Sequence, residues 1–76
     1  MIKTDRVRAL KQLDREIVLA FADHGMRESK AAAALHYHPG SVTYHLDKVR
    51  EVTGLDPRNF YDLIKLVKAI RRGTSA

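Results

Sequence analysis

Ser29 to Gly54 reads SKAAAALHYHPGSVTYHLDKVREVTG, and in it two short helical patterns flank a three-residue turn. Ala32 supplies the small side chain that lets two helices cross closely, and Leu35 and Val42 are spaced to share one core. The three residues before Pro39 cannot continue the first helix, because a proline disfavours helical geometry in the residue that precedes it. This spacing predicts a helix-turn-helix, a unit whose second helix reads the major groove of DNA.

The second helix of this unit opens with Pro39-Gly40-Ser41, and His38 stands at its cap. Proline suits a first helical position, since the N–H that it lacks would have no partner inside the helix. The small residues make this end narrow, so we expect it to enter the major groove with backbone N–H groups aimed at phosphate. Gly54 is expected to end the helix in the left-handed conformation.

A rotation of 100 degrees per residue divides this reading helix into two faces. The apolar face carries Val42, Leu46 and Val49. The opposite face carries Gly40, Ser41, Tyr44 and Lys48. We expect Ser41 and Tyr44 to contact base edges and Lys48 to contact phosphate.

Thr43, His45 and Asp47 lie at the margins between the two faces. Thr43 is suited to a thymine methyl group or a phosphate oxygen, and His45 to phosphate. A competing interpretation is a solvated helix surface on which Tyr44 is half-buried against the next helix. The predicted DNA-contacting residues are His38, Gly40, Ser41, Thr43, Tyr44, His45, Lys48 and Arg50.

Before the unit, one apolar stripe runs from Thr4 to about Asp23, with the three-to-four residue spacing of an amphipathic helix. Its members are Val7, Leu10, Leu13, Ile17 and Phe21. Thr4 or Asp5 can cap this helix and Gly25 can end it; alternatively, the helix breaks near residue 13 and a second one starts at Asp14. Ser29 is expected to cap the short helix that follows it.

After the unit, Asn59 and Asp62 have the spacing of a helix cap with its reciprocal acid. They precede a final amphipathic helix, whose apolar residues are Phe60, Leu63, Ile64, Val67 and Ile70. Residues 73–76 are expected to form a flexible tail. The predicted architecture is one all-α, four-helix domain over residues 1–72, with the helix-turn-helix unit at 29–53.

The composition is basic, with a net charge of +5 and a pI near 9.9, which favours a polyanionic partner. Residues 36–53 are locally neutral, whereas 54–76 hold five basic and two acidic groups. The predicted additional phosphate contacts are therefore Lys65, Lys68, Arg71 and Arg72. The chain has no cysteine, no membrane-length apolar run and no signal-like start, so we expect a cytoplasmic protein. A 76-residue domain is marginal alone, which makes a homodimer attractive.

Catalytic and metal sites are not expected. His36, His38 and His45 could supply three nitrogen ligands, but no cysteine accompanies them and the only nearby acid is Asp47. There is no phosphate loop, nucleophile motif or cluster of acids, and four short helices leave little room for a substrate pocket. We expect no cofactor and no small-molecule substrate.

The segment Ala34 to Leu46, ALHYHPGSVTYHL, is followed by Val49 and by VTGLD at residues 52–56. It resembles the C-terminal helix-turn-helix of the PucR-type regulators of purine catabolism and sugar-diacid use, over about Ile17 to Ile70. A looser similarity reaches the factor-for-inversion-stimulation class. The resemblance implies a bacterial transcription regulator that binds DNA.

The reading helix departs from the pattern of that family, which resembles N-T-V-R-Y-R-L-R-R. Three arginine positions of the pattern are occupied here by Thr43, His45 and Asp47. Fewer cationic contacts release fewer counterions, so binding should be weaker and less dependent on salt. Either flanking basic residues compensate, or this domain reads a different site, or it has drifted toward a role without DNA. The candidates for compensation are Arg50, Lys65, Lys68, Arg71 and Arg72.

The sequence thus predicts sequence-specific binding of double-stranded DNA by a homodimeric transcription regulator. The alternative is a protein-interaction module that keeps the helix-turn-helix as a scaffold. A positive rim around Pro39 to Tyr44 would favour DNA, whereas an apolar patch there would favour a protein partner.

Overall fold

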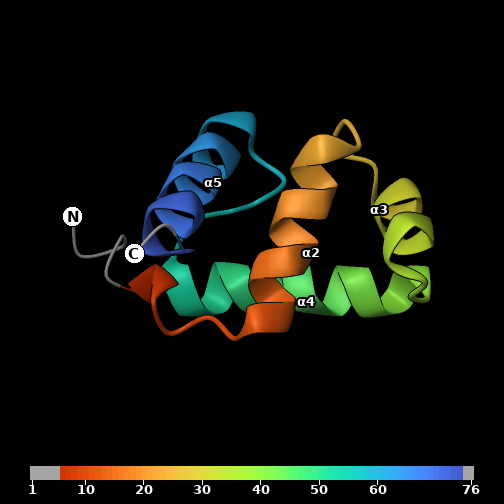
Figure 1. Ribbon diagram of the computed structural model, residues 1–76, viewed down its shortest axis with the longest axis horizontal. Helices are drawn as coiled ribbons and strands as arrows, with labels where there is room; N and C mark the ends of the chain where they lie inside the picture. The colour runs from red at the N-terminus through yellow and green to blue at the C-terminus, as the bar shows by residue number, and fades with distance from the viewer. Residues whose placement is uncertain (1–5, 75–76) are drawn as a thin grey trace.

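The computed structural model describes residues 6–74, which form four helices and no strand. The helices are α2 (Gln12–Asp23), α3 (Glu28–Leu35), α4 (Pro39–Thr53) and α5 (Phe60–Thr74). α2 packs against each of the other three, and Figure 1 shows it standing across the middle of α4, between α3 and α5. The predicted all-α fold with a helix-turn-helix is confirmed.

The first helix is shorter than its apolar stripe predicts, because the chain turns before it. Lys11 is extended, and its backbone N–H donates to the carboxylate of Asp14 at 3.3 Å, so α2 begins at Gln12. The continuous helix from Thr4 is therefore wrong, and the expected break is found close to residue 13. Val7 and Leu10 still reach the core, each 3% exposed, although both lie before the start of α2. The proposed caps at positions 4 and 5 lie outside the described residues.

α3 begins before its predicted cap. Its N-cap is Arg27, so Ser29 lies within the first helical turn. Two left-handed residues, Gly25 and Met26, lie between α2 and the extended N-cap Arg27, so the chain enters the helix at Glu28. Ala32 is 1% exposed, in agreement with its predicted place at a close helix crossing.

Both ends of α4 are as predicted. His38 is the extended N-cap before Pro39, and Gly54 has φ of 76° and donates its N–H to the carbonyl of Arg50 at 2.8 Å. Leu55 then folds back and is 5% exposed. Proline and glycine carry strong local preferences, which explains why this element could be placed from sequence.

α5 begins at Phe60, where Asn59 accepts the backbone N–H of Asp62 at 3.1 Å as expected of a cap. The reciprocal bond differs, since the carboxylate of Asp62 accepts from the N–H of Asp56 instead. Phe60 is 58% exposed and is not part of the core. Leu66 is fully buried and belongs to the core. The helix continues to Thr74, and the remaining two residues of the expected tail lie outside the described part of the chain.

Candidate nucleic-acid interface

The reading helix α4 has one buried and one exposed side, as its sequence predicts. Val42, Leu46 and Val49 are fully buried against the other helices. Tyr44 on the opposite side is 64% exposed, which overturns the interpretation of a tyrosine half-buried against a neighbouring helix. Its ring meets the ring of His45 edge to face, with centroids 5.1 Å apart. Four further predicted contacts at or near this side are also exposed: His38, Gly40, Ser41 and Thr43.

The N-terminal end of α4 offers fewer backbone donors than expected. Pro39 has no N–H, and the N–H groups of Ser41 and Val42 donate to the carbonyl of His38 at 3.0 and 3.4 Å. Gly40 therefore carries the first backbone N–H of the helix. The positive end of the helix dipole adds to the attraction that this end exerts on an anion.

A buried carboxylate lies beneath the reading helix. Asp14 on α2 is 1% exposed, and its Oδ1 is 2.7 Å from Nδ1 of His45. Its Oδ2 lies 3.6 Å from Nζ of Lys48, whose side chain is 30% exposed. His45 and Lys48, both expected at phosphate, are thus partnered inside the domain.

Sequence reasoning missed Asp14, although a signal was present. The residue falls between Leu10 and Ile17 at the three-to-four spacing of the apolar stripe. A carboxylate at such a position must be paired when it is buried, which predicts a cationic or hydrogen-bonding partner on the helix packed against it.

A second polar cluster joins the start of α3 to α4 and to the turn before α5. The guanidinium of Arg58 donates from Nε to Glu28 and from Nη1 to Asp47, both at 2.8 Å. The hydroxyl of Thr43 lies 2.6 Å from the other oxygen of Glu28. The hydrogen bond from Arg58 lowers the pKa of Glu28, against the opposing effect of burial, and the bond to Glu28 raises the pKa of Arg58.

The two clusters account for the three departures from the arginine-rich pattern. Thr43 contacts Glu28, His45 contacts Asp14, and Asp47 contacts Arg58. Each of these side chains is engaged with another part of the domain. Their contact with DNA stays a prediction, and so does that of Arg50, which is exposed on α4.

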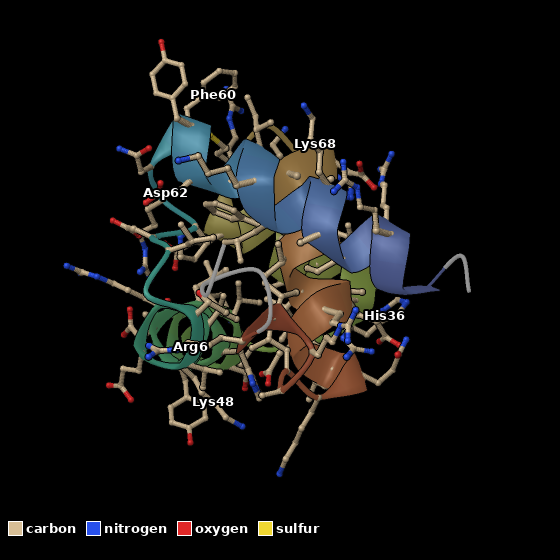
Figure 2. All side chains as sticks on the ribbon, turned by 90° about the vertical axis from the view of Figure 1, so that its left-hand side faces the viewer. Arg6, His36, Lys48, Phe60, Asp62 and Lys68 are labelled. Carbon is tan, nitrogen blue, oxygen red and sulfur yellow. The ribbon has the colours of Figure 1, made fainter. Side chains whose placement is uncertain are left out.

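The four basic residues predicted to assist from α5 are all exposed: Lys65, Lys68, Arg71 and Arg72. Figure 2 shows Lys68 and Lys48 on opposite sides of the molecule. A straight duplex lying against α4 beside Lys48 would therefore not reach Lys68. Contacts of all four residues with phosphate stay predictions.

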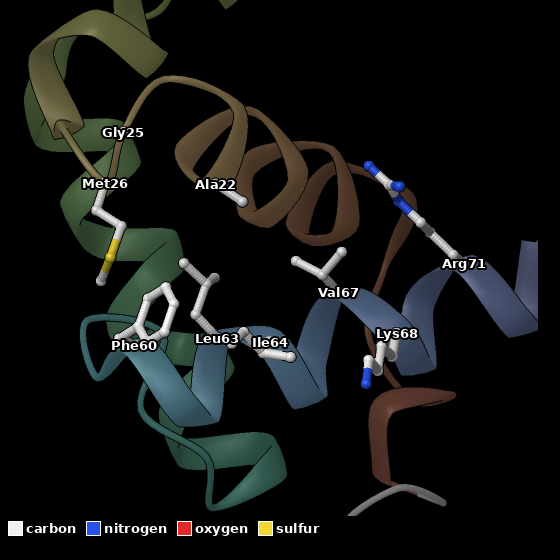
Figure 3. Close-up of a pocket in the computed structure, with 9 residues that line it drawn as sticks. All are labelled: Ala22, Gly25, Met26, Phe60, Leu63, Ile64, Val67, Lys68 and Arg71. Atoms are coloured by element: carbon white, nitrogen blue, oxygen red, sulfur yellow. The ribbon is translucent and has the colours of Figure 1, made fainter.

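A hollow of about 520 Å³ lies between the C-terminal end of α2 and α5 (Figure 3). Met26, Phe60 and Val67 are among its apolar lining residues, and Lys68 also lines it. None of its lining residues belongs to α4. The hollow is therefore not the apolar patch around Pro39 to Tyr44 that would favour a protein partner over DNA.

Within residues 6–74, no three side chains of the His, Cys, Asp and Glu types are placed to hold a metal ion. No helix in this part of the chain has the length and apolar character needed to cross a membrane.

Comparison with protein families matches residues 15–71 to the PucR C-terminal helix-turn-helix domain. This range includes all four helices apart from the first turn of α2 and the last turn of α5. No curated protein and no solved structure gives a significant match.

Proposed function

Because the chain belongs to the family of PucR C-terminal helix-turn-helix domains, we propose that it binds double-stranded DNA sequence-specifically as a transcription regulator. In this proposal it is a bacterial-type, non-enzymatic regulator that acts in the cytoplasm. The reading helix α4 enters the major groove with its exposed side. The observation that carries the proposal is the position of Tyr44, which is 64% exposed on a helix whose other side is fully buried.

The contacts divide by their chemistry. Ser41 and Tyr44 read base edges, because they project from the side of α4 opposite its core. Lys48 and Arg50 contact phosphate, while Lys65, Arg71 and Arg72 are candidates for flanking phosphates. The remaining contacts near the N-terminal half of α4 are His38, Gly40, Thr43 and His45.

The proposal includes a homodimer on DNA. One short helix makes few base contacts, and two linked half-sites about 34 Å apart multiply modest affinities. Sedimentation of the complex with a selected duplex should give two chains per duplex. A complex with a single chain would contradict this part of the proposal.

The primary test is selection from a pool of randomised duplexes, followed by sequencing and by affinity measurements on the selected duplex. We expect enrichment of one motif and weaker binding to a scrambled duplex of equal length. A protein-interaction module that only retains the scaffold would enrich no motif.

Tyr44→Ala should relax the preference at one or two base pairs, at about 1–3 kcal/mol each, since it removes a base contact. The thermal midpoint should change little, because the ring is largely exposed. Competition binding with single-base variants of the selected duplex measures the first quantity, and thermal melting the second.

Tyr61→Ala is the matched control for this change. Tyr61 is 73% exposed and lies on α5, so its loss removes an equivalent ring from another surface. Equal losses of discrimination in the two variants would contradict the assignment of Tyr44 to base reading.

A further inference from the structure

Asp14 is the one carboxylate that lies buried beneath the reading helix in the described part of the chain. It comes from α2, and it contacts His45 and Lys48, which lie three residues apart on α4. His45 contacts one of its oxygens at 2.7 Å, and Lys48 approaches the other at 3.6 Å. The second oxygen also accepts the N–H of Lys11, so the carboxylate is held in place by its own helix.

The chemistry of the pair determines what His45 can present to a ligand. An ionised carboxylate only accepts hydrogen bonds, so Nδ1 of His45 must carry the hydrogen that lies between them. In the neutral ring Nε2 is then an acceptor, suited to the exocyclic amino group of adenine or cytosine in the major groove. It is not suited to a phosphate oxygen, which is also an acceptor.

The carboxylate also compensates the charge of Lys48. An ammonium group attracts phosphate less strongly when a nearby anion partly cancels its positive charge. Its position is restrained at the same time, because Asp14 is buried and is itself held at the start of another helix.

We infer that Asp14 is a positioning residue for DNA recognition, and this inference rests on the proposed function. It fixes the tautomer of His45 and the direction of Lys48, and so it increases discrimination between duplexes. By compensating the positive charge of Lys48, it also weakens the electrostatic attraction of the domain to DNA of any sequence. Asp14 acts through these two side chains and does not itself touch DNA.

The test uses Asp14→Asn, which keeps the size of the side chain and removes its charge. Discrimination between the selected and a scrambled duplex should fall roughly tenfold, the scale of one lost base-specific contact. The slope of log affinity against log salt should become steeper by up to about 0.9, because Lys48 is no longer compensated by Asp14 and neutralises its phosphate more completely. A residue with only a structural role would not produce these two changes together.

Asp23→Asn is the matched control, since it removes the same charge from an exposed position at the end of the same helix. It should leave discrimination unchanged. In a Lys48→Met background, Asp14→Asn should no longer steepen the salt dependence. If the slope steepens equally in that background, Lys48 is not the group that Asp14 compensates.

A measurement on the unaltered domain keeps the inference testable even if Asp14→Asn does not fold. The ¹⁵N chemical shifts of the His45 ring should identify Nδ1 as the protonated nitrogen of the neutral form. Protonation at Nε2 would overturn the inference, as would an Asp14→Asn domain with wild-type discrimination and slope. A wild-type domain that enriches no duplex would overturn the proposed function as well.

Discussion

Glu28 is the residue whose charge ties the helix-turn-helix to the turn before α5. Its carboxylate accepts from Arg58 and from Thr43, and together these bonds connect three segments of the chain. Side chains of this kind lie partly in solvent, where an ion pair contributes about 1 kcal/mol or less. The cluster is therefore expected to orient α3 and α4 more than to hold the fold together.

Glu28→Gln should lower the free energy of unfolding at neutral pH by about 0.5–1 kcal/mol. The pKa of Glu28 is lowered in the folded state, mainly by the hydrogen bond from Arg58. Its contribution is therefore fully present above the pKa of the unfolded chain, and is lost as pH falls through the lower folded-state pKa. Urea unfolding between pH 7 and pH 3 should show the difference from wild type shrinking toward zero in acid.

Glu51→Gln provides the comparison for Glu28, because Glu51 is an exposed glutamate on α4. It should have a smaller effect at neutral pH. A difference between wild type and Glu28→Gln that persists unchanged at pH 3 would show that the ionised carboxylate is not the source of the stability.

Residue roles were predictable where they depend on the geometry of a single helix. The rotation of α4 placed Val42 and Leu46 in the core correctly, because a helix repeats its faces at a constant angle. The partners of His45 and Asp47 were not predictable in the same way. Asp14 lies 31 residues from His45, so their contact depends on how α2 crosses α4.

At the scale of elements, accuracy followed the strength of the local signals. α4 was placed correctly because proline and glycine restrict the backbone at its two ends. The sequence left the start of α2 open between Thr4 and a break near residue 13, since the apolar stripe continues through the turn that precedes the helix, and Val7 and Leu10 are buried without being part of α2. Apolar spacing reports burial directly and helical structure only indirectly.

Gly54→Ala should destabilise the domain by about 1 kcal/mol, because the residue has φ of 76°, a conformation that disfavours a Cβ. Chemical denaturation of the two proteins measures the change. DNA discrimination should be retained at temperatures where the variant is folded, since Gly54 lies at the far end of α4 from the proposed groove-entering end.

Gly40→Ala should preserve stability and weaken DNA binding, the reverse of what is expected for Gly54→Ala. Apart from the neighbouring residues and backbone of its own helix, no atom lies within 4 Å of a Cβ added there. Its position in the first turn of α4 favours alanine, so stability should be unchanged or up to about 1 kcal/mol higher. Affinity for DNA should nevertheless fall, because the added methyl group separates the narrow end of the helix from the duplex. Undiminished affinity would argue against close approach at this end.

At the scale of the whole molecule, α2 contacts all three other helices, and the exposed side of α4 and the hollow beside α5 are formed by different elements. The basic residues are distributed over both regions. Net charge alone therefore does not identify the DNA-binding side, although the sequence correctly indicated that the excess lies outside the reading helix.

Arg50→Gln should reduce the magnitude of the salt slope by about 0.9, the value for one phosphate contact, whereas Lys68→Gln should leave it unchanged. The reason is the placement of Lys68 on the side opposite Lys48 (Figure 2). Affinities measured over a series of salt concentrations give both slopes. A reduced slope for Lys68→Gln would indicate that the duplex bends around the domain or that α5 faces it.

The burial of Asp14 has a consequence for attempts to change what this domain recognises. A transplanted reading helix that lacks a cationic or hydrogen-bonding side chain at positions 45 and 48 would leave the carboxylate of Asp14 uncompensated in the interior, which is strongly destabilising. The reading helix α4 therefore cannot be exchanged independently of α2. New specificity, whether engineered or evolved, has to be acquired by α2 and α4 together.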